Sequence, residues 1–240
     1  MASCKKEEFE QAQRFGTVLI NNQSGLNQLQ LAYNNELYIN PGSSNSVKIP
    51  AGKGLFSFID PSTKNSLLDT SLTIEENSTQ ELVLFRQNDE TPLILLQNTQ
   101  ANEPVPEDGY IKLNLANLAK NALPNPIKII AYQIDENIGD VVPIDTLDNV
   151  QSTFGNYVKV KQTYLYGSLQ SEYYLIIVDA ATNTPLSSIY ITFLASDTQG
   201  VSGKVITAFI EEKLNGTDGV QIKAPNGKTY GVQVKTLFSN

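Results

Sequence analysis

Residues 220–234, VQIKAPNGKTYGVQV, decide the class of fold that this sequence predicts. Apolar and polar residues alternate on both sides of Asn226-Gly227, which is the period of a strand with one buried face. Asn-Gly favours a two-residue turn between antiparallel strands because both of its residues accept positive φ angles. We therefore predict a β-hairpin at the C-terminus, closed by a two-residue turn at Asn226-Gly227.

The same texture extends back along the chain to residue 16. Short runs of β-branched and aromatic residues recur about every ten residues, separated by Asn, Asp, Pro and Gly. This spacing is typical of a sandwich or barrel, so we predict an all-β fold. One short helix is expected at residues 115–123, which Pro124 and Pro126 would stop. The expected strands are residues 17–20, 29–33, 46–49, 55–59, 72–74, 81–85, 93–96, 110–114, 127–134, 157–160, 173–178, 189–194 and 205–210.

The length of 240 residues exceeds that of an ordinary single domain, about 100–200 residues, and predicts two domains. Residues 99–108 contain Pro104, Pro106 and three acidic residues, a composition that does not pair comfortably in a sheet. We expect this segment to be a linker. The predicted organisation is a polar tether at 1–15, a β-sandwich at 16–98, the linker at 99–108 and a second β-sandwich at 109–240.

A weak internal repeat relates the two halves. One strand, turn and strand stretch matches without a gap, and the opening strands of the two halves also match, which predicts two related β-domains in series. Strand and turn texture alone also gives matches of this kind by chance. The aligned segments are 56–63 with 175–182, 72–74 with 191–193, and 16–21 with 109–114.

Composition excludes several classes of function. The net charge is −8 and the 17 Lys and Arg residues are scattered, so nucleic-acid binding is not expected. The chain has no His, which excludes Ser-His-Asp and Cys-His nucleophiles and His-based metal sites. It has no phosphate-binding loop and no dinucleotide-binding glycine motif. We expect a protein that is not an enzyme and has no cofactor.

One catalytic device remains without His, a pair of carboxylates as in glycoside hydrolysis. The densest acidic stretch contains Asp135, Glu136 and Asp140, with Asp145 and Asp148 nearby. The absence of Trp makes an aromatic-lined sugar cleft harder to build. A solvated loop is the alternative interpretation, and no catalytic residue is assigned.

Residues 135–140 also offer oxygen ligands of the kind that calcium binds, and Asp218 in the loop 215–219 is a second candidate. Neither has the spacing of an EF-hand. Asp and Asn in such loops are also ordinary turn formers, so calcium stays open and no metal ligand is assigned.

Tyrosines cluster in the second half at Tyr157, Tyr164, Tyr166, Tyr173 and Tyr174. Exposed tyrosines are favoured at recognition surfaces, because they combine apolar area with a polar tip. Their alternation also fits cross-strand packing on the faces of a sheet. Both interpretations remain open.

The chain has a single cysteine, Cys4, so no disulfide can form within it. The sequence Ala2-Ser3-Cys4-Lys5-Lys6 is similar to the mature start of bacterial lipoproteins, and its Ser-Cys-Lys-Lys form to those of the Bacteroidota. This resemblance implies a lipid anchor at Cys4 and an apolar signal segment upstream that the present sequence lacks. The alternative is a cytoplasmic protein with an incidental thiol near its terminus.

Both halves resemble an uncharacterised family of β-sandwich domains found, often in tandem, in secreted proteins and lipoproteins of the Bacteroidota. The stretches that carry the resemblance are INNQS at 20–24, LNLAN at 113–117 and IPAGK at 49–53; the second half has no clean counterpart of the last. The resemblance implies a fold and an envelope location, not an activity. We expect two immunoglobulin-like or transthyretin-like β-sandwich domains in tandem.

The function expected from these features is that of a lipid-anchored cell-envelope protein, an outer-membrane lipoprotein with a non-catalytic binding or adhesion role. Its ligand would be a glycan or a protein. The alternative is a structural, spacer or fimbria-like surface module without its own ligand, and a carboxylate-pair glycoside hydrolase is a distant third. An exposed aromatic groove would favour binding, and a long unpaired edge strand would favour assembly by strand addition.

Overall fold

The computed structural model describes residues 13–239 except 27, 40–43, 88–90, 99, 171, 188–189 and 195–203. It divides into two compact units, unit 1 at residues 1–98 and unit 2 at residues 99–240. The predicted all-β class is confirmed, since the regular structure of the described residues is strand apart from one 3-10 turn at Gln100–Asn102. Cys4 and most of the expected tether lie outside the described residues. Among the described residues, no helix is long and apolar enough to cross a membrane.

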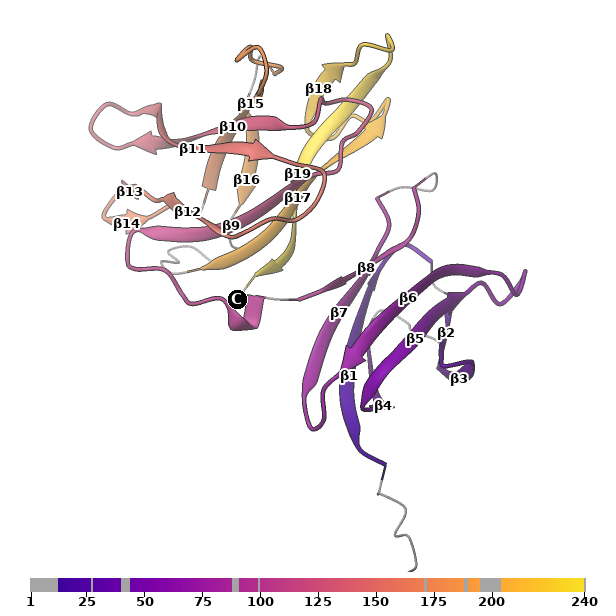
Figure 1. The fold of residues 1–240 in the computed structure, drawn as a ribbon. Helices are drawn as coiled ribbons and strands as arrows, with labels where there is room; N and C mark the ends of the chain where they lie inside the picture. Colours follow the sequence, from indigo (N-terminus) through magenta and orange to yellow (C-terminus); the bar gives the residue numbers. More distant parts are fainter. Residues whose placement is uncertain are drawn as a thin grey trace, which may run out of the picture. The chain divides into compact units, whose positions relative to one another are not determined.

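Unit 1 consists of two layers of strands (Figure 1). Its described residues form a sheet in the order β4-β1-β7-β8 and another in the order β3-β2-β5-β6. Strand β1 is antiparallel to β4 and parallel to β7. The strands are β1 (Phe15–Gln23), β2 (Gln30–Tyr33), β3 (Glu36–Ile39), β4 (Ser44–Pro50), β5 (Gly52–Ile59), β6 (Ser66–Ile74), β7 (Thr79–Phe85) and β8 (Ile94–Gln97).

The core of unit 1 lies between these two sheets. Side chains on β5 alternate between buried and exposed, as they must when one face packs and the other is solvated. Buried residues from both sheets form a single cluster, which establishes a sandwich. Its members include Val18, Ile20, Val47, Ile49, Leu82 and Leu84 from one sheet and Leu31, Tyr33, Phe56, Phe58 and Ile74 from the other.

Unit 2 is also a sandwich, because one buried cluster joins residues of both its main sheets. In the described residues the sheets have the orders β11-β10-β15-β16 and β12-β9-β17-β19-β18, with a separate hairpin β13-β14. The strands are β9 (Tyr110–Asn117), β10 (Ile127–Asp135), β11 (Asp140–Val150), β12 (Val158–Lys161), β13 (Tyr164–Leu165), β14 (Ser168–Leu169), β15 (Glu172–Asp179), β16 (Ile191–Leu194), β17 (Val205–Leu214), β18 (Val220–Lys223) and β19 (Thr229–Ser239).

The two units share one topology. The order β4-β1-β7-β8 corresponds to β12-β9-β17-β19, and β3-β2-β5-β6 corresponds to β11-β10-β15-β16. The pairing directions also agree, including the parallel pairs β1-β7 and β9-β17. The segments that align in sequence lie on these equivalent strands: 16–21 on β1 with 109–114 at β9, and 56–63 at β5 with 175–182 at β15.

This topology distinguishes between the two expected kinds of sandwich. An immunoglobulin domain places its first and second strands in the same sheet. Here β1 and β2 lie in different sheets, and so do β9 and β10. The immunoglobulin order is therefore excluded, and the transthyretin-like alternative is the one that remains.

The helix expected at residues 115–123 is wrong. Strand β9 continues to Asn117, and only one turn follows, closed by the Leu123 amide donating to the Ala119 carbonyl at 2.9 Å. A buried carboxylate binds this turn: Glu212 of β17 accepts from the backbone amides of Asn121 at 3.0 Å and Ala122 at 2.6 Å. The expected helix is absent because residues 115–117 pair with β17, which leaves room for only one turn before Pro124.

The C-terminal hairpin is confirmed as β18 and β19, but its turn is not the expected one. The Gly227 amide donates to the Ala224 carbonyl at 2.9 Å, and Gly227 has a φ of 78° while Asn226 has no positive φ. This is a type I turn followed by a glycine bulge. Pro225 explains the difference, since its fixed φ suits the second position of a type I turn.

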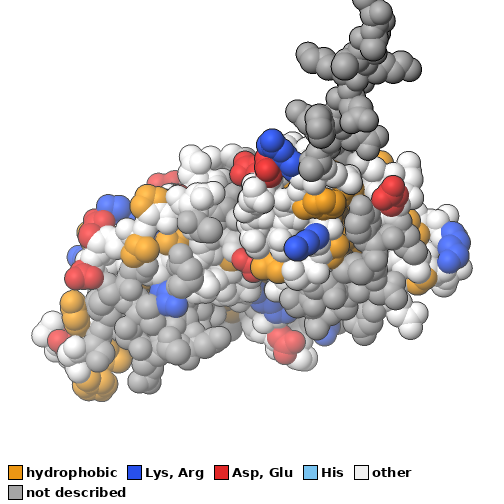
Figure 2. Space-filling model, turned by 90° about the horizontal axis from the view of Figure 1, so that it is seen from below, with side chains coloured by type: hydrophobic (Ala, Val, Ile, Leu, Met, Phe, Trp, Pro, Cys, Tyr) orange, Lys and Arg blue, Asp and Glu red, His pale blue; other side chains and the backbone are white. Residues whose placement is uncertain are grey.

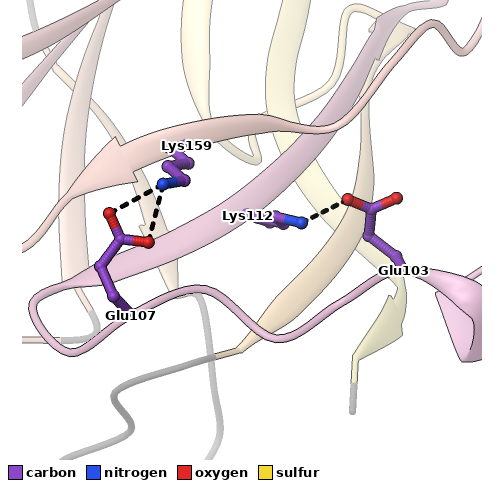
Figure 3. Close-up of polar contacts among 4 residues, drawn as sticks. All are labelled: Glu103, Glu107, Lys112 and Lys159. Atoms are coloured by element: carbon purple, nitrogen blue, oxygen red, sulfur yellow. Dashed lines mark hydrogen bonds and ion pairs between the residues drawn. The ribbon is translucent and has the colours of Figure 1, made fainter.

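Residues 100–108 contain no strand and are bound to unit 2 by side chains. Glu103 pairs with Lys112 of β9 at 2.5 Å, and Glu107 pairs with Lys159 of β12 at 2.7 Å (Figure 3). The Gln100 amide also donates to the Val205 carbonyl of β17. The hydrogen bond from Lys159 holds the pKa of Glu107 below its usual value.

Candidate functional site

The clearest candidate site is a group of three tyrosines in unit 2, one exposed and two half-buried, which we call the tyrosine platform. Tyr132 lies on β10, Tyr174 on β15, and Tyr190 directly before β16. The Tyr132 and Tyr190 rings are 5.1 Å apart at 65°, and the Tyr174 and Tyr190 rings are 6.1 Å apart at 73°. These are edge-to-face contacts, the arrangement that aromatic rings prefer.

Strand register places the platform on the outer face of its sheet. Tyr132 is paired directly with Tyr174 across β10 and β15. Their neighbours Ala131 and Leu175, also paired, are buried in the core. Since side chains alternate along a strand, the tyrosines face away from that core. Tyr190 is 39% exposed, so the platform is open to solvent.

Aliphatic and polar side chains adjoin the rings. Ile130 pairs with Ile176 on the same face, two residues along each strand from the pair of Tyr132 and Tyr174. Exposed Thr192 of β16 is paired with Tyr174. Glu172 lies two residues before Tyr174 and therefore on the same face. The platform thus combines an apolar surface with hydroxyl groups and a carboxylate at its border.

The electrostatics keep Tyr174 a hydrogen-bond donor. Burial against its neighbours raises the pKa of Tyr174, and the negative charge of Glu172 raises it further. The phenol therefore stays protonated throughout the physiological range. Figure 2 shows acidic and basic side chains interspersed among the described residues of the view that it presents.

This arrangement fits one face of a sugar ring. A pyranose presents carbon-bound hydrogens on its face, which can pack on an aromatic ring, and hydroxyl groups around its edge. The phenols can donate to or accept from these hydroxyls, and the Glu172 carboxylate can accept from them. Three fixed rings also lose little conformational freedom when a ligand binds.

Only Tyr174 of the five tyrosines singled out in the sequence belongs to the platform. Tyr173 is a core residue that packs against Phe193 with centroids 6.3 Å apart. The Tyr157 hydroxyl bonds the Thr207 hydroxyl at 2.7 Å, and Tyr164 and Tyr166 are exposed at the β13-β14 hairpin. Tyr132 and Tyr190 were missed. Alternation along residues 127–134 could have located Tyr132, but Tyr190 precedes its strand and carries no such signal.

The acidic residues at 135–140 form a turn between β10 and β11. The Asp135 carboxylate accepts from the Asn137 amide at 2.8 Å, and Gly139 takes a φ of 67°. Asp145 accepts from the backbone amide of Lys161 at 3.2 Å. These carboxylates are therefore occupied by local backbone groups rather than gathered around a cleft.

The other two acidic residues considered for catalysis or calcium binding, Asp148 and Asp218, lie outside this turn. Asp148 lies 3.9 Å from the Lys128 ammonium, and Asp218 lies in the loop between β17 and β18. Within the described part of the chain, no group of three or more acidic, His or Cys residues could hold a metal ion.

Comparisons with known proteins give distant likenesses. No protein-family model and no curated protein matches the sequence. Among solved structures, family 41 carbohydrate-binding modules from streptococcal virulence factors, described as recognising alpha-glucan, are 12% identical over 80% of this chain and 92% of theirs, with a TM-score of 0.26. A proposed cell adhesion protein from Bacteroides eggerthii is 12% identical over 93% of this chain and 95% of its own, with a TM-score of 0.23.

The TIE protein of Bacillus anthracis is 12% identical over 82% of this chain but only 34% of its own, with a TM-score of 0.24. At such TM-scores these likenesses identify neither a ligand nor an activity for this chain.

Proposed function

We propose that this chain is a non-catalytic glycan-binding protein of the cell envelope, and that the tyrosine platform is its binding surface. The observation that carries the proposal is the group of three tyrosines on the outer face of one sheet, where the Tyr190 ring makes edge-to-face contacts with both Tyr132 and Tyr174. Large apolar rings are normally packed inside a protein, and exposed groups of them mark recognition surfaces. A neutral glycan is the ligand class that matches flat rings bordered by hydroxyl groups.

The envelope location is part of the same proposal. Cys4 follows Ala2-Ser3, the small residues typical before an acylated cysteine. Expression of the full-length gene in its native host, with mass spectrometry of the N-terminus and detergent partitioning, tests this step. An acylated Cys4 that keeps the protein in the membrane fraction, and its loss in Cys4→Ala, are expected; an unmodified wild-type cysteine would contradict the anchor.

The binding step is tested by native affinity electrophoresis in gels that contain soluble neutral polysaccharides, such as starch, xylan, glucomannan or laminarin. We expect at least one of them to retard the full chain. The Tyr132→Ala/Tyr190→Ala variant removes two of the three rings and is expected to weaken binding by tenfold or more, about 1.4 kcal/mol.

The chain offers a matched control for this experiment. Tyr164 and Tyr166 are 53% and 91% exposed in the same unit, but outside the platform. Tyr164→Ala/Tyr166→Ala removes the same chemical groups and should leave retardation unchanged. Equal losses in the two double variants, or no retardation of the wild type by any polysaccharide, would overturn the proposal.

A specific observation supports a second candidate, a structural module that assembles by strand addition. Strand β6 lies at the edge of its sheet and is nine residues long. Its single charged residue is Asp69, and it contains no Lys or Pro, the residues that usually protect an edge. Sedimentation velocity at rising concentration would then show assembly of the wild type, and Ser71→Lys on the exposed face of β6 would prevent it.

A further inference from the structure

Unit 2 also contains a pocket of about 520 Å³ that shares no lining residue with the tyrosine platform. Its walls come from β9, from the edge strand β11, from the start of β12, and from residues 151–157, which we call the strap. Its volume lies within the range of small-ligand sites, about 300–1,000 Å³. The described residues that line it are Leu113, Asn114, Leu115, Thr146, Leu147, Asp148, Asn149, Val150, Gln151, Thr153, Gly155, Asn156 and Val158.

The strap is fixed to the sheet beneath it at three points. Near its start, the Gln151 carbonyl accepts from the Asn117 amide at 2.7 Å. In its middle, the Asn114 side chain donates to the Gly155 carbonyl at 2.9 Å and accepts from the Gly155 amide at 3.1 Å. At its end, the Tyr157 and Thr207 hydroxyls are 2.7 Å apart. The pocket wall is therefore already ordered before any ligand binds, which lowers the entropic cost of binding.

Two polar residues of the sheet beneath the strap, Asn114 and Thr207, form hydrogen bonds with it. Asn114 alternates with the core residues Leu113 and Leu115 and so faces outward, yet it is only 6% exposed because the strap covers it. Thr207 is its direct partner on the neighbouring strand β17. A buried amide is costly unless it is hydrogen-bonded, and both polar atoms of Asn114 are used on the strap.

A second recess of about 380 Å³ adjoins the pocket. It is lined by Asn102, Glu103, Gly155, Asn156 and Tyr157, so the two recesses share Gly155 and Asn156 of the strap. Glu103 is neutralised here by Lys112 at 2.5 Å (Figure 3). Gly155 and Asn156 of the strap therefore contribute to the lining of both recesses.

The lining indicates the chemical class of ligand. Among the described lining residues of the larger pocket only Asp148 is charged, and its side chain is 77% exposed. The rest of the lining consists of side-chain amides, hydroxyls and aliphatic groups. No Lys or Arg is among the described lining residues, the nearby Lys128 ammonium is paired with Asp148 at 3.9 Å, and a single peripheral carboxylate does not hold a metal ion. A neutral, hydroxylated molecule with one apolar face matches this lining.

We propose that the strap pocket is a second carbohydrate site, which binds one or two terminal sugar units of a neutral glycan. Leu115, Leu147 and Val150 form the apolar wall, and Asn149, Asn156 and Thr153 supply hydrogen bonds to the sugar hydroxyls. The site binds through its own contacts, whether or not the tyrosine platform binds glycan.

The test is an NMR titration of the ¹⁵N-labelled full chain with four neutral disaccharides, namely maltose, cellobiose, lactose and sucrose, each to about 10 mM. We expect at least one to cause saturable shifts at the amides of Thr153, Gly155 and Asn156. Asn156→Arg places a large charged side chain at both recesses and is expected to weaken this binding by about tenfold or more.

Two further variants serve as checks. Asn114→Leu removes both hydrogen bonds to Gly155 and should also abolish the shifts. If Asn114→Leu does not fold, the Asn156→Arg variant still tests binding in the pocket, because Asn156 is exposed and its replacement should leave the fold intact. Tyr132→Ala/Tyr190→Ala should leave the strap shifts intact. The proposal is overturned if no disaccharide shifts the strap in the wild type, if Asn156→Arg binds as the wild type does, or if the platform variant loses the strap shifts.

Discussion

Unit 1 and unit 2 have the same strand order, but an aromatic pair that faces the core across β2 and β5 in unit 1 has as its counterpart in unit 2 a pair that faces outward across β10 and β15. In unit 1, Tyr33 and Phe56 pair across β2 and β5 with centroids 5.0 Å apart, buried in the core. The aligned repeat places Ala131 and Leu175 at these positions in unit 2. One residue further along, Tyr132 and Tyr174 face outward. A shift of one residue therefore turns a core pair into a surface pair.

The interior of each unit compensates for this difference. In unit 1, Tyr33 packs over Gly54, where a Cβ atom would lie 2.1 Å from the ring. The position aligned with Gly54 is Tyr173 and the position aligned with Tyr33 is Ala131, and both are buried. Each core thus has one tyrosine at this place, supplied by β2 in unit 1 and by β15 in unit 2.

The outer faces show no such compensation. Ala32, Ser57 and Leu55 of unit 1 stand where Ile130, Ile176 and Tyr174 stand in unit 2. Among the described residues of these positions, unit 1 has no aromatic ring. On our account this difference assigns glycan binding to unit 2.

The largest expected effect comes from removing a core ring. Phe56→Ala should lower the free energy of unfolding by about 3–5 kcal/mol, because it deletes a fully buried ring and leaves a cavity. Tyr190→Ala, on the solvated face, should cost less than about 1 kcal/mol. Urea unfolding of the full chain followed by circular dichroism measures both. Similar losses for the two variants would mean that the platform is structural.

A double-mutant cycle tests next whether the buried tyrosine of β2 in unit 1 and the buried tyrosine of β15 in unit 2 occupy equivalent places. Gly54→Tyr alone should destabilise the chain by about 1–3 kcal/mol or more, because two tyrosines then compete for one space. Adding Tyr33→Ala reproduces the arrangement of unit 2 and should recover at least about 1 kcal/mol of that loss. If the double variant is as unstable as the sum of the single ones, the two cores are not equivalent.

Glu212 provides the next smaller effect, in unit 2. Glu212→Gln replaces a carboxylate that accepts from Asn121 and Ala122, and should cost about 1–3 kcal/mol. Hydrogen exchange should report faster opening at residues 118–123. Unchanged exchange there would show that the turn is stable without the carboxylate.

The smallest effect appears only in alkali. Burial raises the pKa of the Tyr173 phenol, and the charge of Asp145 adds to this. The unfolded phenol ionises near pH 10, so the folded state loses stability as the pH rises above that value, by up to about 1.4 kcal/mol per pH unit. Tyr173→Phe should therefore move the midpoint of alkaline unfolding to higher pH. An unchanged midpoint would exclude Tyr173 as the group responsible.

Features that depend on local pattern could be predicted from the sequence. The alternation of apolar and polar residues predicted the C-terminal hairpin. The internal sequence repeat located equivalent strands of the two units. The missed elements depend on distant residues or on edge positions. The helix expected at 115–123 was wrong because residues 115–117 pair with β17, about ninety residues away in the sequence. Strand β11 was missed because Pro143 and its acidic residues are typical of loops, and an edge strand tolerates them.

The candidate site was only partly visible in the sequence. Tyr174 stood within a cluster of tyrosines, but its neighbour Tyr173 faces the core, and composition alone could not separate the two. The platform depends on cross-strand register, which brings Tyr132 beside Tyr174. Tyr190 completes it from outside a strand, so only the folded chain shows the three rings together.

Isothermal titration of the full chain and of its Tyr190→Ala variant with the soluble polysaccharides tests the central claim, that the platform binds glycan, most directly. We expect measurable binding by the wild type and a Kd at least about tenfold weaker for the variant, with the free energy of unfolding changed by less than about 1 kcal/mol. Equal Kd values for the two proteins, or no heat of binding with any of the polysaccharides, would contradict it.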